Sequence, residues 1–281
     1  MDLLEKTKEI CKEHNIKPVR SRGQNFLIKE NVYDKIIESA DLKKDETVLE
    51  VGPGLGFLTE KLAGKVKKVI AVELDDKLVE VLKNKLKSDN IKNVEVVNEN
   101  ILEIFNFQFS IFNFQLSKYK IVANLPYNIT SVFLRKILSS EVKPKLMVLM
   151  LQKEVAERIT AKPGKMSLLA VSVQFYADVQ IIDYVPANNF WPEPEVNSAI
   201  IKLTVGTSFK PVRTLINEKE FFRLVKIGFS AKRKILKNNL ANGFHISQDE
   251  AGDILKKAGF DLKIRAQELS VKDWIRLLKY F

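Results

Sequence analysis

The stretch ETVLEVGPGLGFL, residues 46–58, decides the fold of this chain. A short apolar run that ends in glycines is typical of a buried parallel strand, here over residues 46–51, and a helix is expected to follow over 57–63. Glycines allow the backbone to turn tightly, so a ligand can approach the main-chain amides at the start of the helix. The spacing is G-x-G-x-G rather than the G-x-G-x-x-G of dinucleotide-binding proteins, so the loop predicts a ligand site without naming the ligand.

Apolar runs of strand length alternate with helical patterns downstream of this loop. The expected strands are residues 68–74, 94–98, 120–123, 145–151, 179–185 and 198–205. The expected helices are residues 75–87, 131–138, 154–160 and 167–175. This alternation predicts a doubly wound, Rossmann-like α/β sheet with right-handed crossovers.

The pattern changes after Val205, because only helices are expected beyond it. Residues 206–211 are interpreted as a linker, with the domain boundary near 206–216, and the expected helices are residues 219–229, 231–240, 249–258 and 271–278. We therefore predict two domains. Residues 1–210 hold an N-terminal segment and the Rossmann-like sheet, and residues 211–281 form a small all-α domain.

Positive charge is concentrated in the helical part of the chain. The net charge is +11, and residues 206–281 hold 16 basic and 8 acidic side chains, whereas residues 1–205 hold 30 and 27. Two stretches, residues 17–29 and 221–244, carry basic side chains and no acid. Such runs favour a polyanionic partner. The candidate RNA-binding residues are Arg22, Arg223, Lys226, Lys232, Arg233, Lys234 and Lys237.

Composition excludes several other classes of protein. The single cysteine, Cys11, excludes an intramolecular disulfide, and only two histidines, His14 and His245, argue against a Cys/His zinc site. No apolar run approaches the roughly 20 residues that a membrane helix needs. The first ten residues, MDLLEKTKEI, contain three acids and do not resemble a signal peptide. We expect a reduced cytoplasmic protein that uses no metal ion and no membrane.

Glu73 stands at the end of the strand that follows the glycine loop. A carboxylate at this place in an α/β sheet can accept hydrogen bonds from the two ribose hydroxyls of an adenosine. Both NAD and S-adenosylmethionine contain adenosine, so the loop and Glu73 do not distinguish between these two cofactors.

The tetrapeptide Asn124-Leu125-Pro126-Tyr127 follows the strand expected at 120–123, in the crevice where open α/β sheets bind ligands. Methylation of an exocyclic adenine amine requires acceptors that orient the N–H groups while the nitrogen attacks a methyl group in line. The Asn124 side chain and a backbone carbonyl left free by the following proline supply two acceptors, and Tyr127 supplies a stacking face. This loop therefore favours S-adenosylmethionine and methyl transfer to an adenine.

From about Val19 to its C-terminus, the chain resembles the adenine N6,N6-dimethyltransferases of small-subunit ribosomal RNA, the family whose loss confers kasugamycin resistance. The matching motifs, in order, are GQNFL (23–27), EVGPGLGFLT (50–59), VELD (72–75), NLPYNIT (124–130), LQKEVAER (151–158) and NFWPEPEVNSAI (189–200). The resemblance implies S-adenosylmethionine as the cofactor. It implies that two adjacent adenines near the 3′ end of small-subunit (16S) rRNA are dimethylated in the immature 30S subunit, by a chain that we expect to be a monomer.

The resemblance also implies a role for individual residues. The residues expected to bind the cofactor are Asn25, Leu27, Gly52, Gly54, Glu73, Asn100 and Asn124. The residues expected at the reacting adenine are Asn124, Leu125, Pro126, Tyr127 and Phe190. Tyr127 and Phe190 would sandwich the base, as aromatic side chains commonly do with single-stranded nucleotides. No general base is implied, because positioning and release of a proton to solvent suffice.

One position departs from the family pattern, since Asn100 stands where the family usually has an aspartate that accepts from the adenine amine of the cofactor. Its amide oxygen can accept the same bond, and the neighbouring Glu99 is the alternative.

Three alternatives remain open at this stage. The macrolide-resistance methylases of large-subunit (23S) rRNA share the fold and the chemistry, although they more often read N-I-P-Y at the Asn124 loop. A non-catalytic rRNA-binding assembly factor would retain the basic helices but would not need an intact Glu73 and Asn124. An NAD-dependent dehydrogenase would leave Asn124–Tyr127 without a role.

Overall fold

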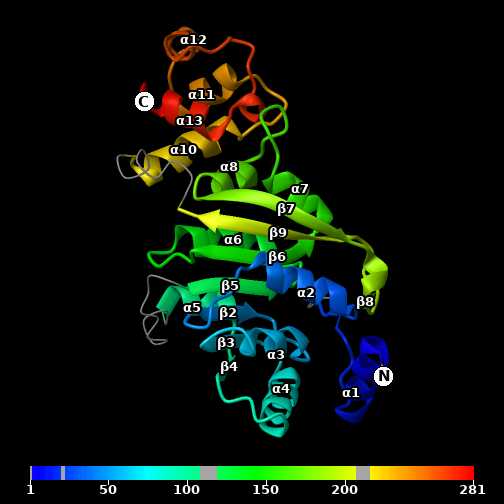
Figure 1. The fold of residues 1–281 in the computed structure, drawn as a ribbon. Coiled ribbons are helices and arrows are strands. Elements are labelled where there is room, and N and C mark those ends of the chain that lie inside the picture. The colour runs from blue at the N-terminus through cyan, green and yellow to red at the C-terminus, as the bar shows by residue number, and fades with distance from the viewer. Residues whose placement is uncertain (1, 20–22, 108–118, 207–215) are drawn as a thin grey trace. The chain divides into compact units, whose positions relative to one another are not determined.

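The computed structural model describes residues 2–19, 23–107, 119–206 and 216–281 (Figure 1). Arg22 and all but the first residue of the linker expected at 206–211 lie outside these residues. The chain divides into two compact units. The first comprises Met1–Ala156 and Gln180–Val205, and the second comprises Glu157–Val179 and Gly206–Phe281.

A seven-stranded sheet forms the centre of the first unit, in the order β4-β3-β2-β5-β6-β9-β7. Its strands are β2 (Thr47–Val51), β3 (Lys68–Glu73), β4 (Val94–Asn98), β5 (Tyr119–Asn124), β6 (Leu146–Gln152), β7 (Ala177–Val185) and β9 (Ser198–Val205). The pairs from β4 to β6 are parallel, and β9 is antiparallel to β6. The predicted Rossmann-like α/β fold is confirmed. The strand order reverses between β2 and β5, and such a switch point is where open α/β sheets bind ligands.

Helices cover this sheet. They are α2 (Glu30–Ser39), α3 (Phe57–Ala63), α4 (Asp76–Ser88), α5 (Ile101–Phe107), α6 (Thr130–Ser139) and α7 (Lys153–Ile159), preceded by α1 (Leu3–Glu13). Figure 1 shows α3 and α4 beside the part of the sheet formed by β3 and β4, with which they are in contact. The helices α1, α2 and α5 are not among those expected from the sequence. The sequence does carry a signal for the start of α1, because Asp2 and Glu5 form a capping box at its N-terminus. It carries no such signal for α2, because the side chain of the preceding residue, Lys29, forms no capping hydrogen bond.

The core of the first unit follows from the sheet. Residues Leu146–Leu151 of β6 are all buried, because a central strand covered on both faces must be apolar along its whole length. One buried charge is compensated at the opposite end of the strands from the glycine loop. Lys120 forms an ion pair with Glu46 at 2.8 Å and donates to the carbonyls of Ala40 and Asp41, where α2 ends.

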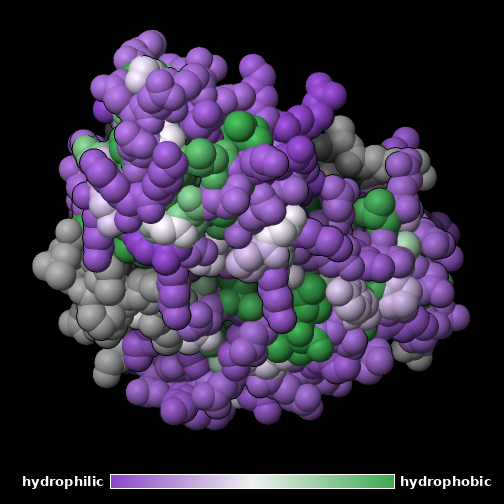
Figure 2. Space-filling view, turned by 90° about the horizontal axis from the view of Figure 1, so that it is seen from above, coloured by the Kyte–Doolittle hydropathy of each residue, from purple (hydrophilic) through white to green (hydrophobic). Residues whose placement is uncertain are grey.

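The second unit is largely helical, with α8 (Leu168–Gln174), α10 (Glu218–Gly228), α11 (Leu236–Phe244), α12 (Gln248–Lys257) and α13 (Val271–Leu278). Phe175 and Phe221 stack in its core with ring centroids 4.4 Å apart, and Trp274 is fully buried. The helix expected at 231–240 begins later than predicted, at Leu236, because the preceding residues form a turn. In the part of the chain that the structure describes, no helix has the length and apolar character needed to cross a membrane. The face seen in Figure 2 is mostly hydrophilic.

Candidate active site

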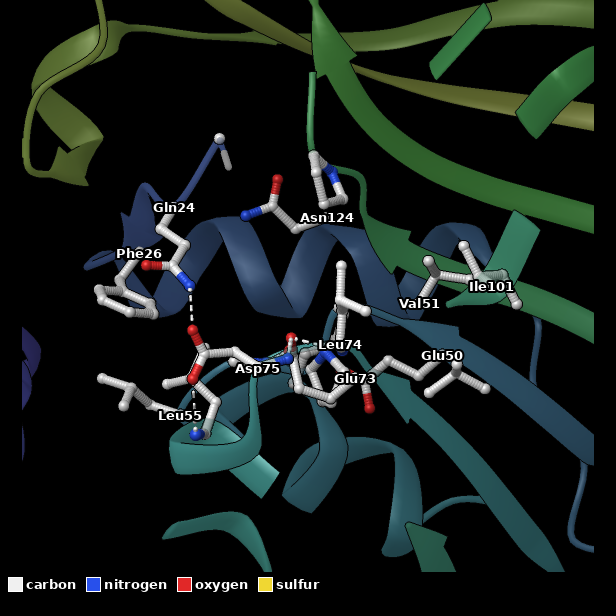
Figure 3. Close-up of a pocket in the computed structure, with 18 of the residues that line it drawn as sticks. Gln24, Phe26, Glu50, Val51, Leu55, Glu73, Leu74, Asp75, Ile101 and Asn124 are labelled. Carbon is white, nitrogen blue, oxygen red and sulfur yellow. Dashed lines mark hydrogen bonds between the residues drawn. The ribbon is translucent and has the colours of Figure 1, made fainter. Parts of the chain in front are cut away.

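An open cavity lies at the carboxyl ends of β2, β3 and β5, within the first unit (Figure 3). Its lining comes from the N-terminal segment 23–27, the glycine loop 52–55, residues 73–75 at the end of β3, residues 99–101 after β4, and Asn124 and Pro126 at the end of β5. Ligand pockets lie preferentially at such switch points. The cavity therefore has the position of a cofactor site.

All the residues predicted to bind the cofactor line this cavity, namely Asn25, Leu27, Gly52, Gly54, Glu73, Asn100 and Asn124. Of the residues predicted at the reacting adenine, Asn124 and Pro126 line it, whereas Leu125, Tyr127 and Phe190 do not. The structure thus brings all the predicted cofactor-binding residues together in one cavity, whereas only some of the residues predicted at the adenine lie there.

The glycine loop is packed closely on both sides. Gly54 has φ +56°, and a Cβ atom placed on it would lie 3.3 Å from the ring of Phe26. Gly52 has φ +67°, and its Cβ would lie 3.5 Å from Pro126. Only glycine adopts such φ values at little cost, and the absence of a side chain keeps the loop amides accessible from the cavity.

Glu73 is held rigidly by backbone amides. Its Oε1 atom accepts from the amides of Leu74 (2.9 Å) and Asp75 (3.0 Å), and Oε2 accepts from Gly54 (3.2 Å). Burial raises the pKa of Glu73, and the three backbone hydrogen bonds oppose that rise. Since each carboxylate oxygen offers about two acceptor positions, Oε2 retains one for a ribose hydroxyl.

Glu50 is a second acid at the cavity, and sequence reasoning gave it no role. It is 1 % exposed, and its Oε2 atom has no hydrogen-bond partner among the described residues. Burial raises the pKa of Glu50 to about 8; Thr59 opposes the rise, Glu73 adds to it and Lys85 opposes it. A buried carboxyl oxygen without a partner suits a positively charged ligand, as the sulfonium and ammonium groups of S-adenosylmethionine are. The signal in the sequence is an acid inside an otherwise apolar strand.

The N-terminal segment is tied to the cavity at several points. Gln24 donates to Asp75 Oδ2 at 3.1 Å, as the dashed line in Figure 3 shows. The two-residue strand β1 (Phe26–Leu27) pairs with β8 (Phe190–Trp191), so that Leu27 lies opposite Phe190. Sequence reasoning missed Gln24, because its partner is 51 positions away. These contacts place Asn25 and Leu27 on the cavity wall.

The Asn124 loop is anchored to the sheet. Asn124 is the last residue of β5 and lies opposite Met150 of β6, whose carbonyl accepts from the Leu125 amide at 3.0 Å. Leu125 is 1 % exposed and serves as an anchor of the loop. Tyr127 is partly exposed, and its hydroxyl forms a 2.6 Å hydrogen bond with Ser198.

Two predicted site residues have surroundings that the sequence did not indicate. Phe190 is 3 % exposed and packs in the core of the first unit. Asn100 caps α5, because its Oδ1 atom accepts from the Leu102 amide at 3.0 Å and its Nδ2 atom donates to Glu103. The amide oxygen of Asn100 therefore has one further acceptor position to offer a ligand.

The basic residues of the second unit are mostly exposed. Arg223 and Lys226 lie on α10, and Lys232, Arg233 and Lys234 lie on the turn that follows it. Lys237, on α11, is partly buried. The cluster is thus available to a polyanion.

Comparison with known proteins is consistent with this geometry. The family model described as ribosomal RNA adenine dimethylase matches residues 15–281. Proteins named ribosomal RNA small subunit methyltransferase A are 43% identical over 280 residues in Dehalococcoides mccartyi (98% of this chain, 92% of the relative) and 40% identical over 279 residues in Enterococcus faecalis (97% and 93%).

Two solved structures are similar along nearly the whole chain. A dimethyladenosine transferase from Plasmodium falciparum has a TM-score of 0.75 at 28% identity (90% of this chain, 95% of that one). The 23S rRNA methyltransferase ErmE has a TM-score of 0.72 at 26% identity (91% and 99%). With a family model that spans residues 15–281 and relatives at 40% identity or more, this chain belongs to the ribosomal RNA adenine dimethylase family.

Proposed function

We propose that this chain dimethylates the N6 amines of two adjacent adenines near the 3′ end of small-subunit rRNA, in the immature 30S subunit, as a step of small-subunit biogenesis. As a member of its family it is an S-adenosylmethionine-dependent methyltransferase. The observation that carries the proposal is that Glu73 and Asn124 line one cavity with the glycine loop between their strands. The names of the curated relatives support the small subunit as the substrate.

The chain's own residues bind and orient the reactants. When bound, S-adenosylmethionine supplies a methyl group on a positively charged sulfur. Glu73 accepts a ribose hydroxyl at the remaining position of Oε2, and the amide oxygen of Asn124 accepts one N–H of the target amine. The carbonyl of Leu125 accepts the other N–H. With the amine oriented, its nitrogen forms the new bond to carbon while the carbon–sulfur bond breaks, and the amine proton leaves to solvent.

The target adenine is held by stacking. Tyr127 supplies one face, and each base–aromatic stack is worth about 1–3 kcal/mol. Phe190 is proposed for the other face, which requires its buried ring to turn out of the core when RNA binds. Unstacking the adenine costs least in a loop or a single strand, which is how the substrate is selected.

The RNA phosphates are held elsewhere in the chain. We assign this role to the domain proposed at residues 211–281, through Arg223, Lys226, Lys237 and the turn 232–234, and to Arg22, which lies outside the described residues. The protein acts as a cytoplasmic monomer and without a metal ion in this proposal.

The test is a methylation assay with labelled S-adenosylmethionine and purified small subunits that lack the modification, followed by mapping of modified adenines by mass spectrometry. We expect two adjacent dimethyladenines near the 3′ end. Label in large-subunit RNA instead would support an activity like that of the macrolide-resistance methylases. Cofactor binding without any dimethyladenine would support a non-catalytic rRNA-binding protein.

Asn124→Ala gives the residue-level test. Loss of a preorganised polar group at a reacting centre costs about 100-fold or more, so we expect the transfer rate to fall by at least about 100-fold with the fold intact. Asn98→Ala is the matched control, because Asn98 ends the parallel strand β4 and does not line the cavity. Full activity of the Asn124 variant would contradict the role given to this residue.

A further inference from the structure

The hydroxyl of Tyr127 is held by Ser198, a serine to which the sequence motifs assign no individual role. Tyr127 Oη lies 2.6 Å from Ser198 Oγ, and either atom can be the donor. Ser198 is completely buried. Burial raises the pKa of Tyr127, and the hydrogen bond to Ser198 opposes the rise, so the phenol is neutral at physiological pH.

The position of Ser198 is fixed by the sheet. It is the first residue of β9 and lies opposite Gln152, the last residue of β6. The residue before it, Asn197, is held on both sides: its carbonyl accepts from the Lys153 amide at 2.9 Å, and its Oδ1 atom accepts from the Ala187 amide at 3.0 Å. The serine hydroxyl is therefore attached to a rigid part of the first unit.

The backbone at the other end of the Tyr127 side chain is also fixed. The loop is tied to β6 through the Leu125 amide, and Gly23 packs against it, since a Cβ atom on Gly23 would lie 3.2 Å from the Tyr127 amide nitrogen. A tyrosine side chain rotates about two bonds. When its backbone and its hydroxyl are both held, the plane of the ring is determined.

Strand β6 thus pairs with both parts of the chain that form the proposed adenine site, the end of β5 at Asn124 and the start of β9 at Ser198. Asn124 lies opposite Met150 of β6, and Ser198 lies opposite Gln152, two residues further along the same strand. The Asn124 amide and the Tyr127 ring are held in register by β6. Such supporting contacts matter because small errors in the orientation of a bound reactant slow the reaction strongly.

We infer that Ser198 is a positioning residue, which fixes the Tyr127 ring so that the target adenine stacks with its N6 amine facing Asn124. This inference rests on the proposed function. Ser198 touches neither cofactor nor adenine in this scheme and acts only through Tyr127.

The inference predicts a characteristic pattern in Ser198→Ala, Tyr127→Phe and the double variant. Each single change removes the same hydrogen bond and leaves the aromatic ring in place. A hydrogen bond of ordinary net strength corresponds to a factor of about 3 to 10, so kcat should fall about three- to tenfold in each single variant. The double variant should be no slower than the slower single one, because the bond is lost only once.

The experiment measures kcat and KM for unmethylated small subunits at saturating cofactor, together with the cofactor Kd by calorimetry and the melting temperature. We expect the loss in kcat, with KM for the subunits and Kd for the cofactor nearly unchanged. Ser140→Ala is the control, because Ser140 donates to the carbonyls of Ile137 and Val142 in the same unit and does not line the cavity.

Three results would overturn the inference. Additive losses in the double variant would show that Ser198 acts on the reaction by another route. Unchanged kcat in both single variants would show that the bond does not position the ring. A lower melting temperature with normal kcat would show a structural role alone. If Ser198→Ala does not fold, Tyr127→Phe with normal kcat is sufficient to reject the inference.

The two failures are distinguishable. An unaltered protein that forms no dimethyladenine in small subunits rejects the proposed function before the variants are compared. An active protein with an additive cycle rejects only the role of Ser198.

Discussion

Glu50 shows at the level of a single residue how the cavity is adapted to a cation. It is the only acid within β2, it is fully buried, and it lies in the wall of the same cavity as Glu73. Burial raises the pKa of Glu50 to about 8, with Thr59, Glu73 and Lys85 contributing smaller and partly opposing effects. Without a cofactor, the folded protein therefore prefers Glu50 in its protonated form at neutral pH.

This preference predicts a pH-dependent stability. Because the folded-state pKa exceeds the ordinary value of 4.5, the folded state binds more protons between pH 4.5 and about 8, and the contribution of Glu50 to stability is lost as pH rises through that interval. Glu50→Gln removes this dependence. At pH 8.5 the cofactor-free variant should exceed the unaltered protein in free energy of unfolding by about 2–5 kcal/mol.

The measurement is urea unfolding of both proteins at pH 5.5 and pH 8.5. The difference between the two proteins, rather than either curve alone, isolates Glu50 from the other groups that titrate. A difference that stays constant between the two pH values would contradict the raised pKa.

The sequence predicted the site residues whose positions follow from the pattern of strands along the chain. The glycine loop, Glu73 and Asn124 each stand at the end of a recognisable strand, and parallel strands bring their carboxyl ends to one edge. Gln24 and Ser198 were missed because their partners are 51 and 71 positions away, and no local pattern records such pairs. The burial of Phe190 was missed for the same reason, since it follows from the pairing of β1 with β8.

Among the elements, the turn between α10 and α11 differs from what local helix propensity predicts. Residues 231–235 contain Lys232, Arg233 and Lys234, good helix formers without glycine or proline, so the sequence favoured one continuous helix from 231. A buried side chain decides otherwise. Asn239 donates from Nδ2 to the carbonyl of Gly228, where α10 ends, at 2.6 Å, and to that of Ala231 at 3.2 Å. The turn is a tertiary feature that overrides local preference.

Asn239→Ala should destabilise this turn. The change leaves the Gly228 carbonyl without its buried partner, which costs about 1–3 kcal/mol. We expect the free energy of unfolding to fall by that amount, with cofactor affinity unchanged, because the cavity belongs to the first unit. Chemical denaturation and calorimetry measure the two quantities.

Asn238→Ala is the control for this prediction, since Asn238 is the neighbouring asparagine on the same helix and is only partly buried. Equal stabilities of the two variants would show that the Asn239 hydrogen bonds do not support the turn.

At the scale of the whole molecule, the predicted cofactor site is acidic, whereas the predicted RNA-binding segment is basic. The cavity in the first unit is lined by Glu50, Glu73, Asp75 and Glu99, which suits a cationic cofactor. Residues 206–281 carry a net charge of +8 out of the total of +11, which suits RNA phosphate. The sequence predicted the basic segment from its composition, but the acidity of the cavity becomes visible only when the strands bring their ends together.

This separation makes cofactor binding and RNA binding independently alterable. Reversal of Lys232, Arg233 and Lys234 to Glu lowers the net charge from +11 to +5 and places three acids on the exposed turn. If each residue neutralises one phosphate, the slope of log K for small-subunit binding against log salt should become shallower by about 3, and affinity should fall most at low salt. Cofactor affinity should not change.

Reversal of Lys83, Lys87 and Lys92, exposed residues of the first unit, gives the same net charge and separates a local contact from a general charge effect. Binding titrations at several salt concentrations, with cofactor calorimetry on the same proteins, measure both quantities. Equal loss of RNA affinity in the two triple variants would mean that net charge alone attracts the RNA, because only a specific phosphate contact depends on where the lost charges lie.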